Sequence, residues 1–335
     1  MFKLRDVIGH REIVQTLIHA VQRDKVAHAC LLMGPPGIGK KTLARAFAEA
    51  LLCDRSDDGE ACGQCRSCRQ LAGENHPDLH RLQPSGASIK IEQMRELQRQ
   101  VQFKPYQARR QVFILETVET MTTEAANCFL KTLEEPSGQT VFLLLSDQPY
   151  TLLPTILSRC LQLQFRPLSH QEVATGLVKI CGVDQSRADK LAPLAGGSLG
   201  RAVELACDNH PWPARSKALE LVQRIPEMNK SQALAIAEQL SADRGEAADG
   251  LEIMFLWFRD MLVYHYTSNQ TLLINQDMVD KLTLQAACFD PGRLVAILED
   301  IKQAKGGILA NANTRLTLEV LMLKIHSYGG YDNAS

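Results

Sequence analysis

Residues 34–42 read Gly-Pro-Pro-Gly-Ile-Gly-Lys-Lys-Thr and carry the residue types of a phosphate-binding loop. The pattern G-x-x-x-x-G-K-[ST] holds phosphates with backbone N–H groups and a lysine, and holds Mg²⁺ with a hydroxyl directly after that lysine. Here Lys41 stands at the hydroxyl position, and Thr42 follows one place late. We therefore expect a loop that holds ATP or ADP, whose use of Mg²⁺ is uncertain.

A second nucleotide element, an acidic pair at the end of a strand, is only half present. In such a pair an Asp positions Mg²⁺ and a following Glu polarises the attacking water. After the apolar run 112–115 come Glu116 and Thr117, and a threonine cannot act as a general base. Glu119 could substitute only if geometry placed it beside the water, so we expect weak or absent hydrolysis. The expected nucleotide-binding residues are Gly34, Pro35, Pro36, Gly37, Ile38, Gly39, Lys40, Lys41, Thr42 and Glu116.

Four closely spaced cysteines form the pattern C-x8-C-x2-C-x2-C in a polar segment, at Cys53, Cys62, Cys65 and Cys68. Four thiolates at short spacing are typical of a structural tetrahedral zinc site, which leaves no open position for catalysis. A redox pair or unrelated free thiols are the alternatives. The other six cysteines stand in mostly apolar contexts, and we expect them in the core: Cys30, Cys128, Cys160, Cys181, Cys207 and Cys288.

Two further short segments contain chemically capable residues. Arg159, in Ser158-Arg159-Cys160, follows a short helical stretch after a strand and could reach the γ-phosphate of a neighbouring subunit. Its position alone favours an ordinary ion-pairing arginine. The His-Pro-Asp sequence at 76–78 could be a site, but a capped turn that enters a strand is the simpler interpretation.

These residues need a scaffold, and the composition indicates a globular one of two or three domains. The chain has 335 residues, 45% of them hydrophobic and 22% charged. Its net charge of −1 gives no global basic field for nucleic acid. The first residues lack the apolar core of a signal peptide and no run is long enough to span a membrane, so we expect a cytoplasmic protein with no membrane partner. In that compartment the cysteines stay thiols or bind metal.

The apolar pattern predicts an α/β domain followed by helical regions. Apolar runs at 27–33, 112–115 and 141–146 predict buried strands of a parallel sheet with helices on both faces. Helical spacing predicts helices over 10–25, over 40–52 directly after the loop, and over 123–135, the last ended by Pro136. Short helices are predicted over 169–207, a linker at 210–213, and helices throughout 214–328.

Taken together, the motifs resemble the clamp-loader branch of the AAA+ ATPases. The resemblance is carried by the phosphate loop, by the four-cysteine insert after its helix, by residues 125–136 (AANCFLKTLEEP) and by residues 156–160 (ILSRC). The His-Pro-Asp turn and the segment 197–202 (GSLGRA) are similar to one non-motor subunit type of the bacterial DNA polymerase III loader.

The resemblance implies three domains: an AAA+ nucleotide-binding-like domain at 1–166 with the zinc insert at 53–68, a helical lid at 167–209 and a helical collar at 210–335. It implies a hetero-pentamer with delta and tau or gamma subunits, which loads a sliding clamp onto primer-template DNA. It also implies that Arg159 is a finger acting in trans on a neighbour's ATP. In active relatives a lid arginine senses the γ-phosphate, whereas the aligned position here is Gly200, with Arg201 one place later.

Three functions are therefore weighed. A non-hydrolysing clamp-loader subunit agrees with Lys41, Thr117 and Gly200 together, and an active tau/gamma-type motor does not. A zinc-dependent nucleic-acid-binding module is weaker, because phosphate neutralisation dominates DNA affinity and the chain has no basic field. Direct DNA contact would come from polar positions such as Asn127 and Lys131, which an ordinary solvated helix face explains equally well.

Overall fold

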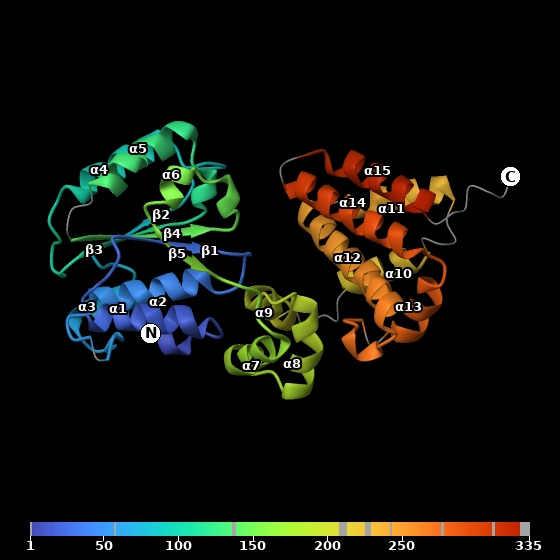
Figure 1. Ribbon diagram of the computed structural model, residues 1–335, viewed down its shortest axis with the longest axis horizontal. Coiled ribbons are helices and arrows are strands. Elements are labelled where there is room, and N and C mark those ends of the chain that lie inside the picture. The colour runs from blue at the N-terminus through green and yellow to red at the C-terminus, as the bar shows by residue number, and fades with distance from the viewer. Residues whose placement is uncertain are drawn as a thin grey trace. The chain divides into compact units, whose positions relative to one another are not determined.

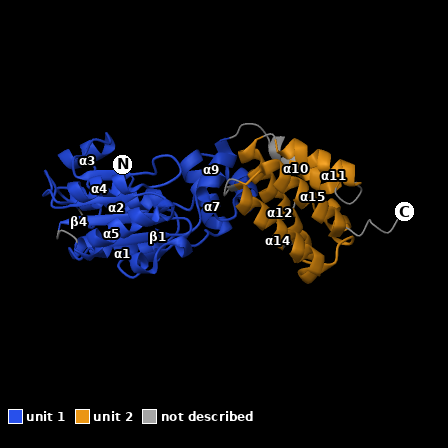
Figure 2. Ribbon diagram, turned by 90° about the horizontal axis from the view of Figure 1, so that it is seen from above, with its two compact units in different colours: residues 1–207 blue, residues 208–335 orange. Residues whose placement is uncertain are grey.

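The computed structural model describes residues 2–56, 58–135, 139–207, 213–224, 229–241, 243–275, 278–309 and 312–328. The chain divides into two compact units, residues 1–207 and 208–335, which Figure 2 shows in different colours. Each unit has its own hydrophobic core, and the two are described separately here.

A parallel sheet of five strands forms the centre of the first unit (Figure 1). The strands are β1 (Ala29–Met33), β2 (Leu79–Leu82), β3 (Gln111–Leu115), β4 (Thr140–Ser146) and β5 (Leu161–Gln164), in the spatial order β2-β3-β4-β1-β5. Every residue of β1, β3 and β4 is buried, as expected for strands covered on both faces. The strand that precedes the phosphate loop, β1, therefore lies between β4 and β5.

Helices cover both faces of this sheet (Figure 1). On one face lie α1 (Arg11–Gln22), α2 (Lys40–Leu52) and α3 (Arg66–Ala72), and on the other α4 (Ile91–Val101), α5 (Thr123–Glu134) and α6 (Pro154–Leu157). Side chains along β1 alternate between the two cores: Cys30 and Leu32 join one, and Leu31 joins the other. The same part of the first unit also contains three short 3₁₀ helices: η1 (Leu4–Asp6), η2 (Val118–Thr120) and η3 (Pro149–Thr151).

Three helices follow the sheet and complete the first unit: α7 (His170–Cys181), α8 (Gln185–Leu191) and α9 (Leu199–Cys207), with η4 (Ala192–Ala195) between the last two. Ser169 and Glu172 form a capping box that starts α7, and Gly182 in the left-handed region ends it. The Gly-Gly-Ser segment 196–198 then turns the chain into α9, whose first residues contact the phosphate loop. We call residues 167–207 the lid.

The second unit is helical throughout its described part. Its helices are α10 (Pro213–Arg224), α11 (Lys230–Leu240), α12 (Arg244–Thr267), α13 (Val279–Ala286), α14 (Pro291–Leu309) and α15 (Thr314–Tyr328), with η6 (Gln270–Leu272) after α12. Trp257 of α12 is fully buried, and its indole Nε1 donates to Gln285 Oε1 at 2.8 Å. Gln285 Nε2 in turn donates to the carbonyl of Val222 at 3.0 Å, which joins three helices through one buried polar path.

The structure confirms the predicted α/β region and the helical regions after it, with corrections to one strand and two cysteines, and it adds helices α3 and α4, which were not predicted. Strand β5 was not predicted, because Leu161–Gln164 alternates apolar and polar residues over only four positions at a sheet edge. Cys207 and Cys288 are exposed, so placing them in the core was wrong: Cys207 is the last residue of α9, and Cys288 lies just beyond α13. Cys128, Cys160 and Cys181 are half-buried. The predicted helix stop at Pro136 and most of the predicted linker lie outside the described residues. Among the described helices, none has the length and apolar character needed to cross a membrane.

Candidate functional site

The phosphate loop connects β1 to α2 and has the backbone shape its glycines predict. Gly34, Gly37 and Gly39 have φ angles of 149°, 74° and 100°, in a region that glycine adopts without strain. Gly34 N–H donates to the carbonyl of Ser146 at 3.2 Å, which fastens the start of the loop to the end of β4. Within the described residues, the N–H groups of Gly37, Ile38 and Gly39 find no protein acceptor. Together with the N-terminus of α2 they form an anion-binding cradle.

Lys40 is buried and already surrounded by acceptors of the same chain. Only 7% of its surface is exposed, and Nζ donates to the carbonyls of Gly34 at 2.6 Å and Pro35 at 2.5 Å. Its charge is balanced by Asp147, whose Oδ1 lies 2.7 Å from Nζ. Asp147 directly follows β4 at the carboxyl edge of the sheet, next to the loop. The amine expected to face phosphate is therefore paired with an internal carboxylate.

Lys41 forms the second ion pair of the site. Its Nζ lies 2.8 Å from Oε2 of Glu116, which follows β3 at the same edge of the sheet. Lys41 is 64% exposed, whereas the Glu116 side chain is 16% exposed. The other carboxylate oxygen of Glu116, Oε1, is buried without a hydrogen-bond donor in the described structure. The ammonium group thus lies against Glu116, the acid that the sequence predicted beside a metal ion.

The residue after this acid has an unusual backbone. Thr117 has a φ angle of 49°, in the left-handed region that a β-branched side chain rarely adopts. Glu119, the alternative base, accepts the N–H of Asp147 at 3.1 Å through Oε1. Glu119 therefore positions the segment that carries Asp147.

The lid contacts the loop directly. Gly200 N–H donates to the carbonyl of Gly37 at 2.7 Å, and Ser198 Oγ donates to the carbonyl of Pro36 at 3.1 Å. A Cβ atom built on Gly200 would lie 3.0 Å from the Cα atom of Gly37. The absence of a side chain at position 200 thus eases this close approach, since a Cβ atom there would require the lid or the loop to shift by a few tenths of an ångström.

Loop, strand ends and lid together enclose a cavity of about 510 Å³. Its polar wall is formed by the phosphate loop, Glu116 and Asp147, and its apolar wall by the lid residues Ile180, Leu199 and Val203. The volume lies within the range of ordinary small-molecule sites.

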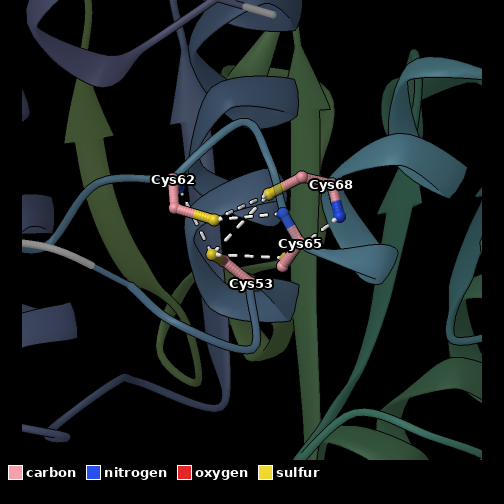
Figure 3. A group of neighbouring side chains, drawn as sticks. All are labelled: Cys53, Cys62, Cys65 and Cys68. Carbon is pink, nitrogen blue, oxygen red and sulfur yellow. Dashed lines mark hydrogen bonds between the residues drawn. The ribbon is translucent and has the colours of Figure 1, made fainter.

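The four predicted zinc ligands come together in one cluster (Figure 3). Their Sγ atoms lie within 4.8 Å of one another, with separations of 3.6 Å for Cys53–Cys68 and 3.9 Å for both Cys53–Cys65 and Cys62–Cys68. Zinc–sulfur bonds of about 2.3 Å in a tetrahedron require sulfur atoms about 3.8 Å apart. The cluster could therefore hold a zinc ion with little rearrangement.

Backbone N–H groups support the cluster. Those of Cys62, Cys65 and Cys68 donate to Sγ of Cys53, Cys62 and Cys65, at 3.3, 3.4 and 3.3 Å. Hydrogen bonds from the N–H groups of Gln64 and Cys65 lower the pKa of the Cys62 thiol to about 6, which favours its thiolate, whereas burial raises the pKa of the Cys53 and Cys68 thiols.

The insert is fastened to the rest of the first unit. Buried Glu60 accepts the N–H groups of Leu4 at 2.9 Å and Arg5 at 3.0 Å, and Asp54 accepts Ser67 Oγ at 2.8 Å. The insert therefore organises both the chain start and α3.

The His-Pro-Asp segment is a structural turn, as predicted. Asp78 is buried, with its carboxylate accepting the N–H groups of Tyr106, Gln107 and Ala108 at 2.5, 2.9 and 2.8 Å. His76 Nδ1 accepts the N–H of Asp78 at 3.1 Å. The turn joins the start of β2 to the loop before β3.

Arg159 lies just after α6 and is 34% exposed. Its Nη2 is 2.6 Å from Oε1 of Glu134 on α5, and its Nη1 donates to the carbonyl of Thr155 at 3.0 Å. The guanidinium is thus held at the surface by an ion pair within the chain. Asn127 and Lys131 are exposed on the same α5.

Two residues of this arrangement were missed from the sequence, Asp147 and Glu134. Asp147 directly follows a predicted strand, and parallel strands end at one edge of a sheet, so its position was a usable signal. Glu134 gave no signal, because its pairing with Arg159 joins segments that only the fold brings together.

Family models match both parts of the chain. The model of the DNA polymerase III delta subunit matches residues 9–169, and that of its C-terminal region matches residues 210–327. DNA polymerase III subunit delta' of Pseudomonas aeruginosa is 35% identical over 318 residues, 92% of this chain and 94% of that protein. The delta' subunit of Bacillus subtilis is 29% identical over 93% of this chain and 95% of that protein.

Similarity extends to other subunits of the same enzyme. DNA polymerase III subunit tau of Bacillus subtilis is 25% identical over 96% of this chain and 61% of that protein. Among solved structures, a DNA polymerase III gamma subunit-related protein of Thermotoga maritima matches with 17% identity and a TM-score of 0.39, over 94% of this chain and 99% of that one. On the full-length similarity to the delta' proteins, the chain belongs to the DNA polymerase III delta-prime family.

Proposed function

We propose that this chain is the delta-prime-type subunit of a DNA polymerase III clamp loader, which helps place a sliding clamp on primed DNA. The observation that carries the proposal is the end-to-end similarity to delta' of Pseudomonas aeruginosa, which leaves 6% of that protein uncovered. The partners are delta and tau or gamma subunits in a hetero-pentamer, with the clamp and primer-template DNA reached through the complex. Residues 1–166 act as the AAA+ domain, 167–209 as the lid and 210–335 as the collar, in the cytoplasm.

The chain acts in this complex as a structural and switching subunit with weak or no ATP hydrolysis. The support is the pairing of each charged group of the loop inside the chain, Lys40 with Asp147 and Lys41 with Glu116. A threonine at position 117 adds the loss of the base. Each missing catalytic group is expected to lower hydrolysis by orders of magnitude.

Arg159 is the finger that this subunit supplies to the ATP of its neighbour. It stands at the surface after α6, with a guanidinium whose remaining N–H groups can bind phosphate oxygens. Its partner Glu134 is itself half exposed, and exposed ion pairs contribute about 1 kcal/mol or less. A neighbour's triphosphate can therefore compete for the guanidinium at small cost.

The four cysteines hold a structural zinc ion. The sulfur separations fit a closed tetrahedron, and the insert touches no part of the phosphate loop in the hydrogen bonds of the described residues. Zinc here stabilises the fold around α3 and the chain start. A zinc-dependent DNA-binding role gains no support from the overall charge of the chain, which is −1.

An active tau/gamma-type motor is the second candidate, favoured by the similarity to tau of Bacillus subtilis. The Lys41–Glu116 pair opposes it at the expected metal position, the Lys40–Asp147 pair at the expected third phosphate, and the Gly200–Gly37 contact at the expected sensor arginine.

Reconstitution separates these candidates. The chain is combined with delta and tau subunits, the clamp and primed circular DNA. We expect one copy per complex, no clamp loading without it, and negligible ATP turnover by the chain alone. Substantial turnover by the isolated chain would support the motor instead.

The finger is tested by Arg159→Ala, with exposed Arg166→Ala as the matched control. Hydrolysis at the adjoining site should fall by about 10³-fold or more, since fingers in trans contribute on this scale. Unchanged hydrolysis in the Arg159→Ala complex would show that Arg159 is an ordinary surface residue.

A further inference from the structure

The position of Lys41 raises the question of what the phosphate loop can still bind. The motif places a hydroxyl there to coordinate Mg²⁺ beside the acid at the end of the neighbouring strand. In this chain Nζ of Lys41 lies 2.8 Å from that acid, Glu116. A divalent cation at the same place would meet the ammonium at repulsive distance and would lack the hydroxyl ligand. The residues therefore do not fit Mg²⁺ in its usual position, and Lys41 supplies one positive charge there instead.

Lys40 and Asp147 change the opposite end of the site. In a working loop this lysine reaches the β- and γ-phosphates. Here Asp147 Oδ1 lies 2.7 Å from Nζ of Lys40, so a carboxylate lies where a third phosphate would contact this lysine. Two anions at that point repel each other, whereas a shorter ligand avoids the contact.

The cradle for the inner phosphates remains intact. The three loop glycines keep their left-handed conformations, and the N–H groups of Gly37, Ile38 and Gly39 have no acceptor in the described part of the chain. Gly37 is exposed and Gly39 is half-buried, so these donors are open to the cavity, and N–H groups that converge at a helix N-terminus favour an anion. The cavity of about 510 Å³ continues past the cradle to the lid, where apolar Ile180, Leu199 and Val203 can contact a base or ribose.

We propose that this site binds a nucleoside diphosphate without Mg²⁺, with the Lys41 ammonium in the place of the metal and the Asp147 carboxylate in the place of the third phosphate. Lys41 bridges Glu116 and the outer phosphate of the ligand, and Lys40 moves from the loop carbonyls to the same group. The ligand fastens loop to lid, which already touch through Gly200 and Gly37. This binding does not depend on the clamp-loading role, because the isolated chain contains the whole site.

Calorimetry on the full chain tests ligand choice, with ADP, ATP and inorganic pyrophosphate as probes, each in EDTA and in MgCl₂. We expect ADP to bind with a dissociation constant below about 1 mM. The dissociation constants measured in EDTA and in MgCl₂ should agree within about twofold. ATP should bind about tenfold more weakly than ADP, because Asp147 leaves no room for a third phosphate. Pyrophosphate should also bind about tenfold more weakly, because it lacks the contacts of the nucleoside. No ADP binding at millimolar concentration would overturn the proposal. The proposal would also be overturned if ATP bound more tightly than ADP. It would likewise be overturned if pyrophosphate bound as tightly as ADP, because the nucleoside would then contribute nothing.

Two substitutions test the assigned groups. Lys41→Thr restores the hydroxyl of the motif, so ADP binding in EDTA should weaken about tenfold, the scale of one charge-assisted hydrogen bond, and Mg²⁺ should now restore it. Lys104→Thr, at an exposed lysine outside the cavity, should change neither value. Asp147→Asn should bring ATP to the affinity of ADP. A Lys41→Thr chain that binds ADP as wild type does in EDTA would show that the ammonium does not replace the metal.

Discussion

Substitution of Asp78 offers a sharp test of how the first unit is held together. Its carboxylate is 1% exposed and accepts three consecutive backbone N–H groups, from Tyr106, Gln107 and Ala108. The loop carrying these donors has no regular secondary structure of its own, so the carboxylate fixes its conformation. Gln107 also donates to Gln70 of α3, which links this loop to the helix that follows the four-cysteine insert.

The magnitude follows from the three hydrogen bonds. A hydrogen bond to a charged group contributes about 1.5–3 kcal/mol, which would sum to roughly 4.5–9 kcal/mol if all three donors stayed buried and unpaired. The loop lies at the surface, where Tyr106 is exposed, so water can replace part of what is lost. We expect Asp78→Ala to lower the free energy of unfolding of the first unit by about 3–4 kcal/mol. Asp78→Asn keeps the shape and one acceptor oxygen, and should cost about 2 kcal/mol.

The assay must separate the two units. Both tryptophans, at positions 212 and 257, belong to the second unit, so tryptophan fluorescence follows that unit. Urea unfolding of the full chain is therefore followed by fluorescence and by amide hydrogen exchange in β2 and β3. The substitutions should lower protection in β2 and β3 and leave the fluorescence transition in place. A change below about 0.5 kcal/mol in the first unit for Asp78→Ala would refute the assignment, because surface substitutions have effects of that size.

Four other predictions concern the metal, pH, the finger and the strained threonine. Removal of zinc by a chelator should lower the free energy of unfolding of the first unit by about 4 kcal/mol, compared with the protein in free zinc at about 1,000 times the dissociation constant. Loss of one zinc equivalent with an unchanged melting temperature would contradict a folding role. Burial lowers the pKa of His10, His76 and His80 in the folded chain. As the pH drops below about 6.5 the unfolded chain therefore binds protons before the folded chain does, and the free energy of unfolding should fall. Thermal melts at pH 7.5 and 5.5 check this, and a higher melting temperature at pH 5.5 would contradict it. Glu134→Gln should release Arg159 and raise ATP turnover of the assembled loader by at most about fivefold, the equivalent of about 1 kcal/mol, whereas a tenfold drop would show that Glu134 orients the finger. Thr117→Asn should stabilise the chain by about 1 kcal/mol, because asparagine tolerates the left-handed backbone better, and an unchanged or lower denaturant midpoint would count against strain there.

The four-cysteine cluster and the main strands could be predicted because their signals are local. Short cysteine spacing limits how far four thiolates can separate, and β1, β3 and β4 are apolar at nearly every position. The four-residue strand β5 is recognised as a strand only through its pairing with β1. Cys207 and Cys288 show the converse error, since an apolar sequence context near a helix end does not decide which side of the helix is covered.

The phosphate loop was predicted in place and shape, whereas its electrostatics depend on residues far away in sequence. Lys40 to Asp147 and Lys41 to Glu116 are pairings between loop and strand ends that only the parallel sheet brings together. From the motif alone, Lys41 could equally have pointed into solvent. The contact between Gly200 and Gly37 likewise needs the lid in place, although the glycine itself was visible as a mismatch.

The Lys40–Asp147 and Lys41–Glu116 pairs show that a residue of a nucleotide-binding motif can be retained for a reason other than its usual ligand. Glu116 occupies the position of a metal-positioning acid, yet its Oε2 serves Lys41, so the same acid is required for a different reason once a lysine replaces the hydroxyl. Replacing Glu116 would leave Lys41 without its partner, and replacing Asp147 would leave the buried ammonium of Lys40 uncompensated, which costs more than the loss of an exposed pair. If the site has lost its metal, as we propose, the two ion pairs give a structural reason why Glu116 and Asp147 are retained. The residue that tests this is Lys41, because our proposal places its ammonium group where Mg²⁺ would bind.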